Sequence, residues 1–355
     1  MNSILRGAGY DSEIFCEYVH PEFRHLAKKV NGAKFKAPRG SILIFHFSVA
    51  TNSLLRLADS DSKICLRYHN VTPETFFNQT DEIDTHGVCK VGRSQIAMVS
   101  AISDWIMADS QYNADEIKST RTKNCDVVPL LRNYESIFSN KSDKNFKELL
   151  DPHSKKKTIL FVGRLAPNKR QEDLIQYLSI YKKYVDSDLR LIMIGSELTK
   201  SYREKLCQYC LDLGLKVSNY KDKPDPDFDV LLTGSVSDEV LLAAYQNSTA
   251  FVSVSEHEGF CVPIVEAMRA GLPILAHPSS AIPATIGEAG VLSNKFQPES
   301  FIADLKRVLT DSAFRDHLKR NCKIRYQDLK LESASSLFMR SLNQMMLFYE
   351  RRSIE

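Results

Sequence analysis

The chain has 355 residues, of which 43% are hydrophobic, 26% are charged and 9% are aromatic, and this globular composition excludes disorder along the whole length. Its 47 Lys and Arg against 44 Asp and Glu give a net charge of +3, so we expect no nucleic-acid partner and no global attraction to an anionic membrane. The length favours two domains over one.

The N-terminus and the cysteines carry the signals for cellular location. Residues 1–11 lack the apolar core of a signal peptide, and the apolar stretch 41–50 is far shorter than the roughly 20 residues of a membrane span. The eight cysteines are scattered, and the Cys-x-x-Cys of Cys207 and Cys210 has no second pair at zinc-site spacing. We expect a cytoplasmic protein with reduced thiols and no metal site.

Short apolar runs alternate with amphipathic stretches, a pattern that predicts parallel βα units and a doubly wound sheet. The expected strands are residues 12–16, 41–45, 63–68, 105–108, 126–129, 158–162, 190–194, 229–232, 250–254 and 273–276. Helices are expected between them, notably over 82–100, but not after the last strand. From 299 to 349 the chain is expected to be almost entirely helical, including 313–330 and 334–349.

A lapse of this pattern divides the chain. Residues 130–157 are polar and charged and end in Asp-Pro-His-Ser-Lys-Lys-Lys, which is linker composition. We therefore expect two Rossmann-like lobes, 1–133 and 158–333, joined by a linker over 134–157, with the C-terminal helix 334–355 as a candidate to complete the first lobe. Residues 305–330 hold eight Lys and Arg against three Asp; a solvated helix face is favoured, and a surface for an anionic partner is the alternative.

The most specific segment, Ser-Glu-His-Glu-Gly-Phe-Cys-Val-Pro-Ile-Val-Glu-Ala-Met at 255–268, lies where a strand is expected to give way to a helix. Gly259 permits close backbone approach to a ligand, Pro263 suits a first helical turn, and free amides at the helix start favour an anion. Glu258 and Glu266 have the spacing to bond hydroxyls on either side of a phosphate bridge. The alternative is a helix-capping acid at 258 and an exposed helix residue at 266.

A basic segment follows the strand over 158–162, Gly-Arg-Leu-Ala-Pro-Asn-Lys-Arg at 163–170. It lies at the carboxyl edge of the expected sheet, where open α/β folds bind ligands. Arg164 and Lys169 are therefore expected to converge on one anion, for which a diphosphate is the natural choice. The alternative is a basic loop screened by solvent.

Together these segments resemble the group 1 retaining nucleotide-sugar glycosyltransferases (family 4), which have the GT-B fold of two Rossmann-like lobes facing a cleft. The resemblance is carried by Gly163-Arg164-x-x-Pro-x-Lys169 and Glu258-x7-Glu266. Supporting segments are Ile-Gly at 194–195, Thr-Gly-Ser-Val-Ser-Asp at 233–238 and Gly-Leu-Pro-Ile at 271–274, so that the second lobe matches over about 158–292.

This resemblance implies roles for single residues. Arg164 and Lys169 would hold the donor diphosphate and offset charge on the leaving group, Glu258 would contact hydroxyls of the donor sugar, and Glu266 would contact the ribose. Further donor contacts are implied for Gly163, Gly195, Gly234, Val236, Gly259, Phe260 and Cys261. The donor is expected to be a GDP- or UDP-sugar, and no metal is required.

The first lobe resembles the acceptor lobe of polysaccharide and lipopolysaccharide mannosyl- or rhamnosyltransferases, on segments 45–48, 67–74 and 108–114. His46 and His69 both follow expected strands, and His69 is the candidate catalytic residue, with a packed or surface role as the alternative. Relatives begin with a strand and a glycine turn, whereas residues 1–10 resemble the end of the first helix, so we expect either that the start of the chain is truncated or that this lobe lacks its first strand and glycine turn.

The sequence thus predicts transfer of a hexose from a nucleotide diphosphate sugar to a hydroxyl of a glycan or lipid-linked glycan acceptor. The anomeric configuration is expected to be retained, and contact with a membrane, if any, to be peripheral. Two alternatives stay open. One is a degenerate glycosyltransferase-like protein that binds a nucleotide or a partner, and the other is a sugar-nucleotide epimerase on the same fold.

Overall fold

The computed structural model describes residues 1–30, 37, 40–54, 57, 62–78, 83–120, 125–150, 156–222, 224–294 and 297–352. They form two compact units. The first unit contains residues 1–71, 91–131 and 331–355, and the second contains residues 72–90 and 132–330. The C-terminal segment therefore belongs with the first third of the chain, whereas residues 72–90 belong with the second half.

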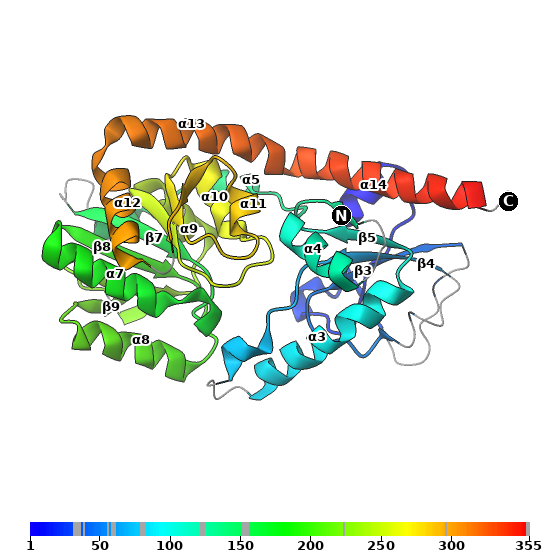
Figure 1. The fold of residues 1–355 in the computed structure, drawn as a ribbon, viewed down its shortest axis with the longest axis horizontal. Helices are drawn as coiled ribbons and strands as arrows, with labels where there is room; N and C mark the ends of the chain where they lie inside the picture. Colours follow the sequence, from blue (N-terminus) through cyan, green and yellow to red (C-terminus); the bar gives the residue numbers. More distant parts are fainter. Residues whose placement is uncertain are drawn as a thin grey trace. The chain divides into compact units, whose positions relative to one another are not determined.

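The first unit is built on a four-stranded parallel sheet of order β3-β4-β5-β6 (Figure 1). Its strands are β3 (Ile42–Phe47), β4 (Lys63–Tyr68), β5 (Trp105–Ala108) and β6 (Cys125–Val127), and a separate short pair is β1 (Phe15–Cys16) with β2 (Lys28–Lys29). Its helices are α1 (Asn2–Gly7), the second part of α3 (Ile83–Ile102), α4 (Gln111–Thr120) and α14 (Leu331–Arg352). Among the described residues β3 pairs with β4 alone, so it is an edge strand.

The two faces of this sheet are covered by different helices because successive strand residues point to opposite sides. Leu66 and Ile106 pack against residues of α3 and α4, including Ile96 and Ile117. Their neighbours Cys65 and Met107 pack on the other side, against α1 and α14. The side chains that α1 and α14 contribute there are Leu5, Phe338, Leu342 and Met345. Helix α14 is thus part of the core of the first unit.

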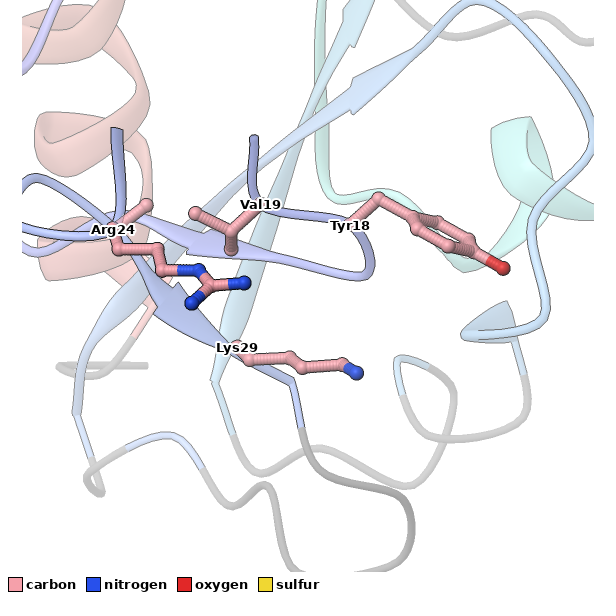
Figure 2. A pocket seen from close by; sticks show the side chains of 5 residues that line it. Tyr18, Val19, Arg24 and Lys29 are labelled. Atoms are coloured by element: carbon pink, nitrogen blue, oxygen red, sulfur yellow. The ribbon is translucent and has the colours of Figure 1, made fainter. Parts of the chain in front are cut away.

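The N-terminal segment of the first unit leaves large apolar side chains in solvent. Tyr18 is 93% exposed, Phe23 54% and Leu26 55%. Figure 2 shows Tyr18 directed away from the segment, with Arg24 and Lys29 beside a hollow of about 360 Å³. Exposed rings and cations therefore lie together on this segment.

The second unit is built on a seven-stranded parallel sheet of order β13-β12-β11-β7-β8-β10-β9 (Figure 1). Its strands are β7 (Lys157–Val162), β8 (Leu189–Ile194), β9 (Val217–Asn219), β10 (Val230–Gly234), β11 (Ala250–Ser253), β12 (Ile274–Ala276) and β13 (Gly290–Leu292). The chain builds outward from β7 on one side, then returns and places β11 on its other side. Ligands of open α/β sheets bind at such a reversal of strand order, so the carboxyl ends of β7 and β11 mark the expected site.

Helices cover both faces of this sheet. They are α5 (Glu135–Phe138), α6 (Lys144–Leu150), α7 (Gln171–Tyr184), α8 (Lys200–Asp212), α9 (Asp238–Asn247), α10 (Val262–Ala270), α11 (Ile282–Ile286), α12 (Pro298–Thr310) and α13 (Ser312–Leu329). Helices α7, α8 and α12 share one core with Ile159, Leu191 and Val230. On the other face Tyr245 of α9 stacks on Phe251 of β11, with ring centroids 6.5 Å apart.

The strand predictions agree with the structure to within a few residues, but three strands were missed, the two-residue β2 of the separate pair and β9 and β13 of the larger sheet. β9 and β13 are three residues long and lie at the two edges of the sheet, where partial exposure leaves little apolar pattern. β12 is followed by the short helix α11, where no helix was expected.

The segment expected as a linker, 134–157, differs most from its prediction. It contains α5 and α6, and Phe146 and Leu150 of α6 are buried in the second unit. Few apolar residues suffice to anchor so short a helix, so its composition remains that of a loop. Residues 151–155 of this segment, like residue 82 of the helix expected over 82–100, lie outside the described residues.

The basic stretch 305–330 lies on α12 and α13 and is partly structural. Arg325 donates to the backbone oxygens of Ala284 (2.7 Å) and Thr285 (3.2 Å), and Arg315 donates to that of Leu309 (2.8 Å). The exposed remainder is Lys306, Arg307, Lys319, Arg320 and Lys323. No helix in the described ranges combines the length and apolarity that a membrane crossing requires.

Helix α3 makes a backbone contact that depends on a glycine. An ideal Cβ on Gly92 would lie 2.8 Å from the backbone nitrogen of Ala50 and 3.1 Å from the carbonyl carbon of Val49. Gly92→Ala should therefore lower the free energy of unfolding of the first unit by about 1–3 kcal/mol. Urea unfolding followed by the fluorescence of Trp105, the single tryptophan of the chain, measures this change.

Gly87 provides the matched control, because it lies in the same helix with nothing within 4 Å of its ideal Cβ. Alanine favours helix over glycine by about 1 kcal/mol, so Gly87→Ala should leave stability unchanged or raise it. Equal effects of the two substitutions would contradict the close packing of α3 at Gly92.

Candidate functional site

Two loops meet at the carboxyl ends of β7 and β11, which are neighbours in the sheet. The backbone nitrogen of Glu256 donates to the backbone oxygen of Asn168 at 2.9 Å. The side-chain nitrogen of Asn168, which is buried, donates to the backbone oxygen of His257 at 3.3 Å. The loop over 163–170 is therefore bonded directly to the loop over 255–261.

This joining brings Lys169 and Glu258 together. Lys169 lies in the short 3-10 helix η4 (Pro167–Lys169), and its Nζ is 2.6 Å from Oε1 of Glu258. Both side chains are less than one fifth exposed, so water screens the pair only in part. The backbone nitrogen of Glu258 donates to Oγ of Ser280 at 2.7 Å, which holds the main chain at this residue.

The turn after Glu258 leads into α10 as the sequence predicts, but with a different cap. Cys261 occupies the N-cap position in the left-handed region, with φ 68°, and Pro263 lies in the first turn. The interpretation of Glu258 as a capping acid is therefore wrong. Burial raises the pKa of the Cys261 thiol well above its usual value, and the Glu258 carboxylate adds to this shift, so Cys261 is a neutral thiol.

Glu266 lies inside α10 and is 3% exposed, so its interpretation as an exposed helix residue is wrong. Its Oε2 accepts the hydroxyl of Tyr245 at 2.9 Å, and its Oε1 accepts Nη2 of Arg132 at 3.0 Å. Burial raises the pKa of Glu266, and the Arg132 charge and the Tyr245 hydrogen bond oppose that rise. Two partners thus hold this carboxylate in a fixed orientation.

The glycines of the expected site lie on adjacent strand ends. Gly163 donates to the backbone oxygen of Ile194 at 2.8 Å, and Gly195 donates to that of Gly234 at 3.1 Å. Gly195 has φ 149°, and an ideal Cβ there would lie 2.1 Å from the backbone oxygen of Gly163, so no side chain fits. Val236 follows two residues after Gly234, whose own φ is 68°.

Arg164 and Lys169 differ in their surroundings. Arg164 is exposed, and its guanidinium forms no ion pair with any residue the structure describes, while its backbone oxygen accepts from Gln171 at 2.9 Å. Lys169 is paired with Glu258. Phe260, between Glu258 and the start of α10, is buried, and its backbone oxygen accepts from Thr285 at 2.6 Å.

In the first unit, His69 belongs to a chain of bonded side chains at the ends of β3, β4 and β5. Nδ1 of His69 is 2.6 Å from Oδ2 of Asp109, whose Oδ1 is 2.7 Å from Nη2 of the buried Arg67. Nε2 of His69 is 2.7 Å from Nδ1 of His46. This arrangement fits Nδ1–H of His69 donating to the carboxylate and Nδ1–H of His46 donating to His69.

His46 is the last side chain of this hydrogen-bonded series, and the residue as a whole is exposed. Desolvation of the ring lowers the pKa of His46, and the positive charge of Arg67 lowers it further, so His46 is neutral. The sequence singled out both histidines. It did not single out Asp109, the partner of His69, or Arg132, the partner of Glu266. Each pair joins residues far apart in the chain, and the local pattern carries no signal for such a pair.

The described part of the chain contains no candidate metal site. Across the described ranges, no three His, Cys, Asp or Glu side chains come together as ligands of one ion. The eight cysteines are free thiols, Cys207 and Cys210 included.

Comparison with known proteins identifies the second unit. Residues 142–325, more than half of the chain, match the family model of the glycosyl transferases group 1. An uncharacterized glycosyltransferase of Methanocaldococcus jannaschii is 28% identical over 182 residues, which are 50% of this chain and 42% of the relative. The serotype-specific mannosyltransferase WbdA of Escherichia coli is 27% identical over 161 residues, 45% of this chain and 18% of that protein.

The matched stretch thus spans less than half the length of these relatives. Among solved structures, the Anabaena protein HepE in complex with UDP and glucose superposes with a TM-score of 0.64 and 17% identity, over 82% of this chain and 76% of that one. This likeness confirms the α/β GT-B fold class. By its family match, the chain belongs to the group 1 glycosyltransferases.

Proposed function

We propose that the chain transfers a hexose from a GDP- or UDP-sugar to a hydroxyl of a glycan or lipid-linked glycan acceptor, with retention of configuration. The observation that carries this proposal is the pairing of Lys169 with Glu258 at the reversal of strand order, 2.6 Å apart and next to the start of α10. One cation and one carboxylate side by side suit a substrate in which a phosphate adjoins a hydroxyl-bearing sugar.

The donor diphosphate takes the cationic side of this site. Lys169, the exposed Arg164 and the N-terminal end of α10 offer positive charge to it. Glu258 accepts hydroxyl protons of the donor sugar, and Glu266 uses its remaining lone pairs for the ribose hydroxyls. In this proposal, side chains and amides neutralise the leaving diphosphate, and no metal is required.

In the reaction, an acceptor hydroxyl oxygen forms the new bond to the anomeric carbon. The bond from that carbon to the diphosphate oxygen breaks, and its electron pair leaves with the nucleoside diphosphate. The proton of the attacking hydroxyl passes to the departing phosphate on the same face of the sugar. His69, held by Asp109, contributes a fixed hydrogen-bonding group on the acceptor side.

Membrane contact belongs to the proposal because the acceptor class includes lipid-linked glycans. Tyr18, Phe23 and Leu26 are more than half exposed, and Arg24 and Lys29 line the same hollow as Tyr18 (Figure 2). Apolar side chains next to cations are suited to the headgroup region of an anionic bilayer. The contact is peripheral in this proposal.

Variants of the donor site separate sugar contact from phosphate contact. Glu258→Ala should abolish turnover yet leave nucleoside diphosphate affinity within a few fold, because it removes a contact to the sugar. Arg164→Ala with Lys169→Ala should weaken nucleoside diphosphate binding by about 2–4 kcal/mol, allowing for non-additivity. Thermal shift with UDP, GDP, ADP and dTDP measures binding, and a radiolabelled donor measures turnover.

Lys319→Ala with Arg320→Ala is the matched control, since both side chains are exposed on α13. No shift with any of the four nucleotides in a cooperatively folded sample would overturn the proposal in favour of a degenerate protein. A donor consumed without acceptor and returned as another sugar nucleotide would instead establish an epimerase.

The histidine chain makes its own prediction. His69→Ala should lower turnover about 100-fold or more and leave nucleoside diphosphate affinity unchanged, because it lies in the other unit from the donor residues. His317→Ala, exposed on α13, is the control. Asp109→Asn should shift the pH profile of turnover, since it removes the carboxylate bonded to Nδ1 of His69. An unchanged profile would remove Asp109 from the mechanism.

Membrane contact is tested by cosedimentation with vesicles of phosphatidylglycerol and phosphatidylcholine. Replacing Tyr18, Phe23 and Leu26 by serine should reduce sedimentation with anionic vesicles severalfold, whereas Ile324→Ser, 69% exposed on α13, should not. Equal binding of the triple variant and the parent chain would exclude this segment as the contact.

A further inference from the structure

A pocket of about 510 Å³ lies within the second unit, beside the donor loops. Phe76, from the 3-10 helix η3 (Glu74–Phe77), lines it together with Arg170 and Glu256. Glu172 of α7 and Ser201 of α8 line it as well. Its volume is within the range of small-ligand sites.

This pocket is distinct from the donor site but shares both of its loops. Glu256 precedes Glu258 by two residues, and Arg170 directly follows Lys169. Its other walls come from α7 and α8, which share one core, whereas Glu266 lies on α10. The residue expected to hold the ribose therefore does not line it.

The charges of the lining are balanced, and two of the charged side chains are held by hydrogen bonds. Arg170 binds Asp173 through two bonds of 2.9 Å, and Glu172 accepts the hydroxyl of the buried Tyr202 at 2.6 Å. With Lys205, the pocket has two cations and two carboxylates. A second nucleotide or phosphate would need an excess of positive charge, whereas fixed carboxylates and cations suit neighbouring uncharged hydroxyls.

An aromatic ring completes the lining. Phe76 is half-buried, and its ring lies 5.9 Å from that of His257, between Glu256 and Glu258. A ring face offers an apolar surface to the C–H face of a sugar, while the hydroxyl edge meets the polar wall. Ser201 adds a hydroxyl at the start of α8.

We propose that this pocket binds an uncharged saccharide residue of the glycan acceptor, a role that rests on the proposed transferase function. Because Arg170 and Glu256 of the donor loops line the pocket and Glu266 does not, a sugar residue of the acceptor bound there would lie next to the donor loops without overlap with the nucleotide. Phe76 and Glu256 then determine which glycans are accepted, and neither takes part in the chemical step.

The test is saturation-transfer NMR of the full chain with methyl α-mannoside, methyl α-glucoside and a mannose disaccharide, each at roughly 10 mM because single sugars bind weakly. In the parent chain, at least one probe should give a signal that survives saturating UDP and GDP. Ser201→Trp, which projects a large side chain into the pocket from an exposed position, should reduce that signal about tenfold or more. Ser201→Ala is the matched control.

Phe76→Ala should also reduce the saccharide signal, because it removes the aromatic ring from the lining. This second variant keeps the test decisive if the Ser201→Trp variant does not fold. The pocket assignment would be overturned if UDP or GDP abolished the saccharide signal of the parent chain. It would also be overturned if the signal were unchanged in both variants, or if no probe gave a signal. Binding of inorganic phosphate in place of saccharide would overturn it as well. Nucleotide thermal shift of the same variants is read separately, so loss of the donor site is distinguished from loss of this pocket.

Discussion

The bonds between the loops after β7 and β11 are the constraint on which the whole site depends. The strand ladder positions only the strands, and the loops beyond it are free to diverge. Asn168 removes that freedom with its backbone oxygen and its side chain, bonded to Glu256 and His257. Because Asn168 is buried, these bonds face little competition from water. The contact of Lys169 with Glu258 is their consequence.

The two carboxylates of the glutamate motif differ in their burial and in the number of their partners. Glu266 is buried, and a buried charge is tolerated only with partners, which Tyr245 and Arg132 supply. Such a group is fixed and suits a part of the substrate that does not change during reaction. Glu258 keeps some contact with water and is balanced by a single lysine. In the proposed reaction, it is therefore the carboxylate that exchanges its partner for a sugar hydroxyl.

The sequence predicted best those elements whose bounds are determined by residues close together in the chain. β4 and β5 agree with their predicted bounds because both are apolar runs in the centre of a sheet, and the start of α10 follows from Gly259 and Pro263. Edge strands β9 and β13, and the helices of the expected linker, depend on contacts with distant segments and leave weak patterns. The partners of the site residues, Arg132 and Asp109, were missed for the same reason, since pairing across the fold has no spacing rule.

The residue after Lys169 shows how firmly the loop is held. Arg170 adopts φ 54°, a left-handed conformation that costs a residue with a side chain about 1 kcal/mol or more. Such a conformation persists only where its surroundings fix it, and the two bonds from Arg170 to Asp173 do so. Lys169 and Arg170 are thus neighbours in one rigid turn but have different partners, Glu258 and Asp173. A backbone held this way gives the neighbouring pocket a wall of fixed conformation.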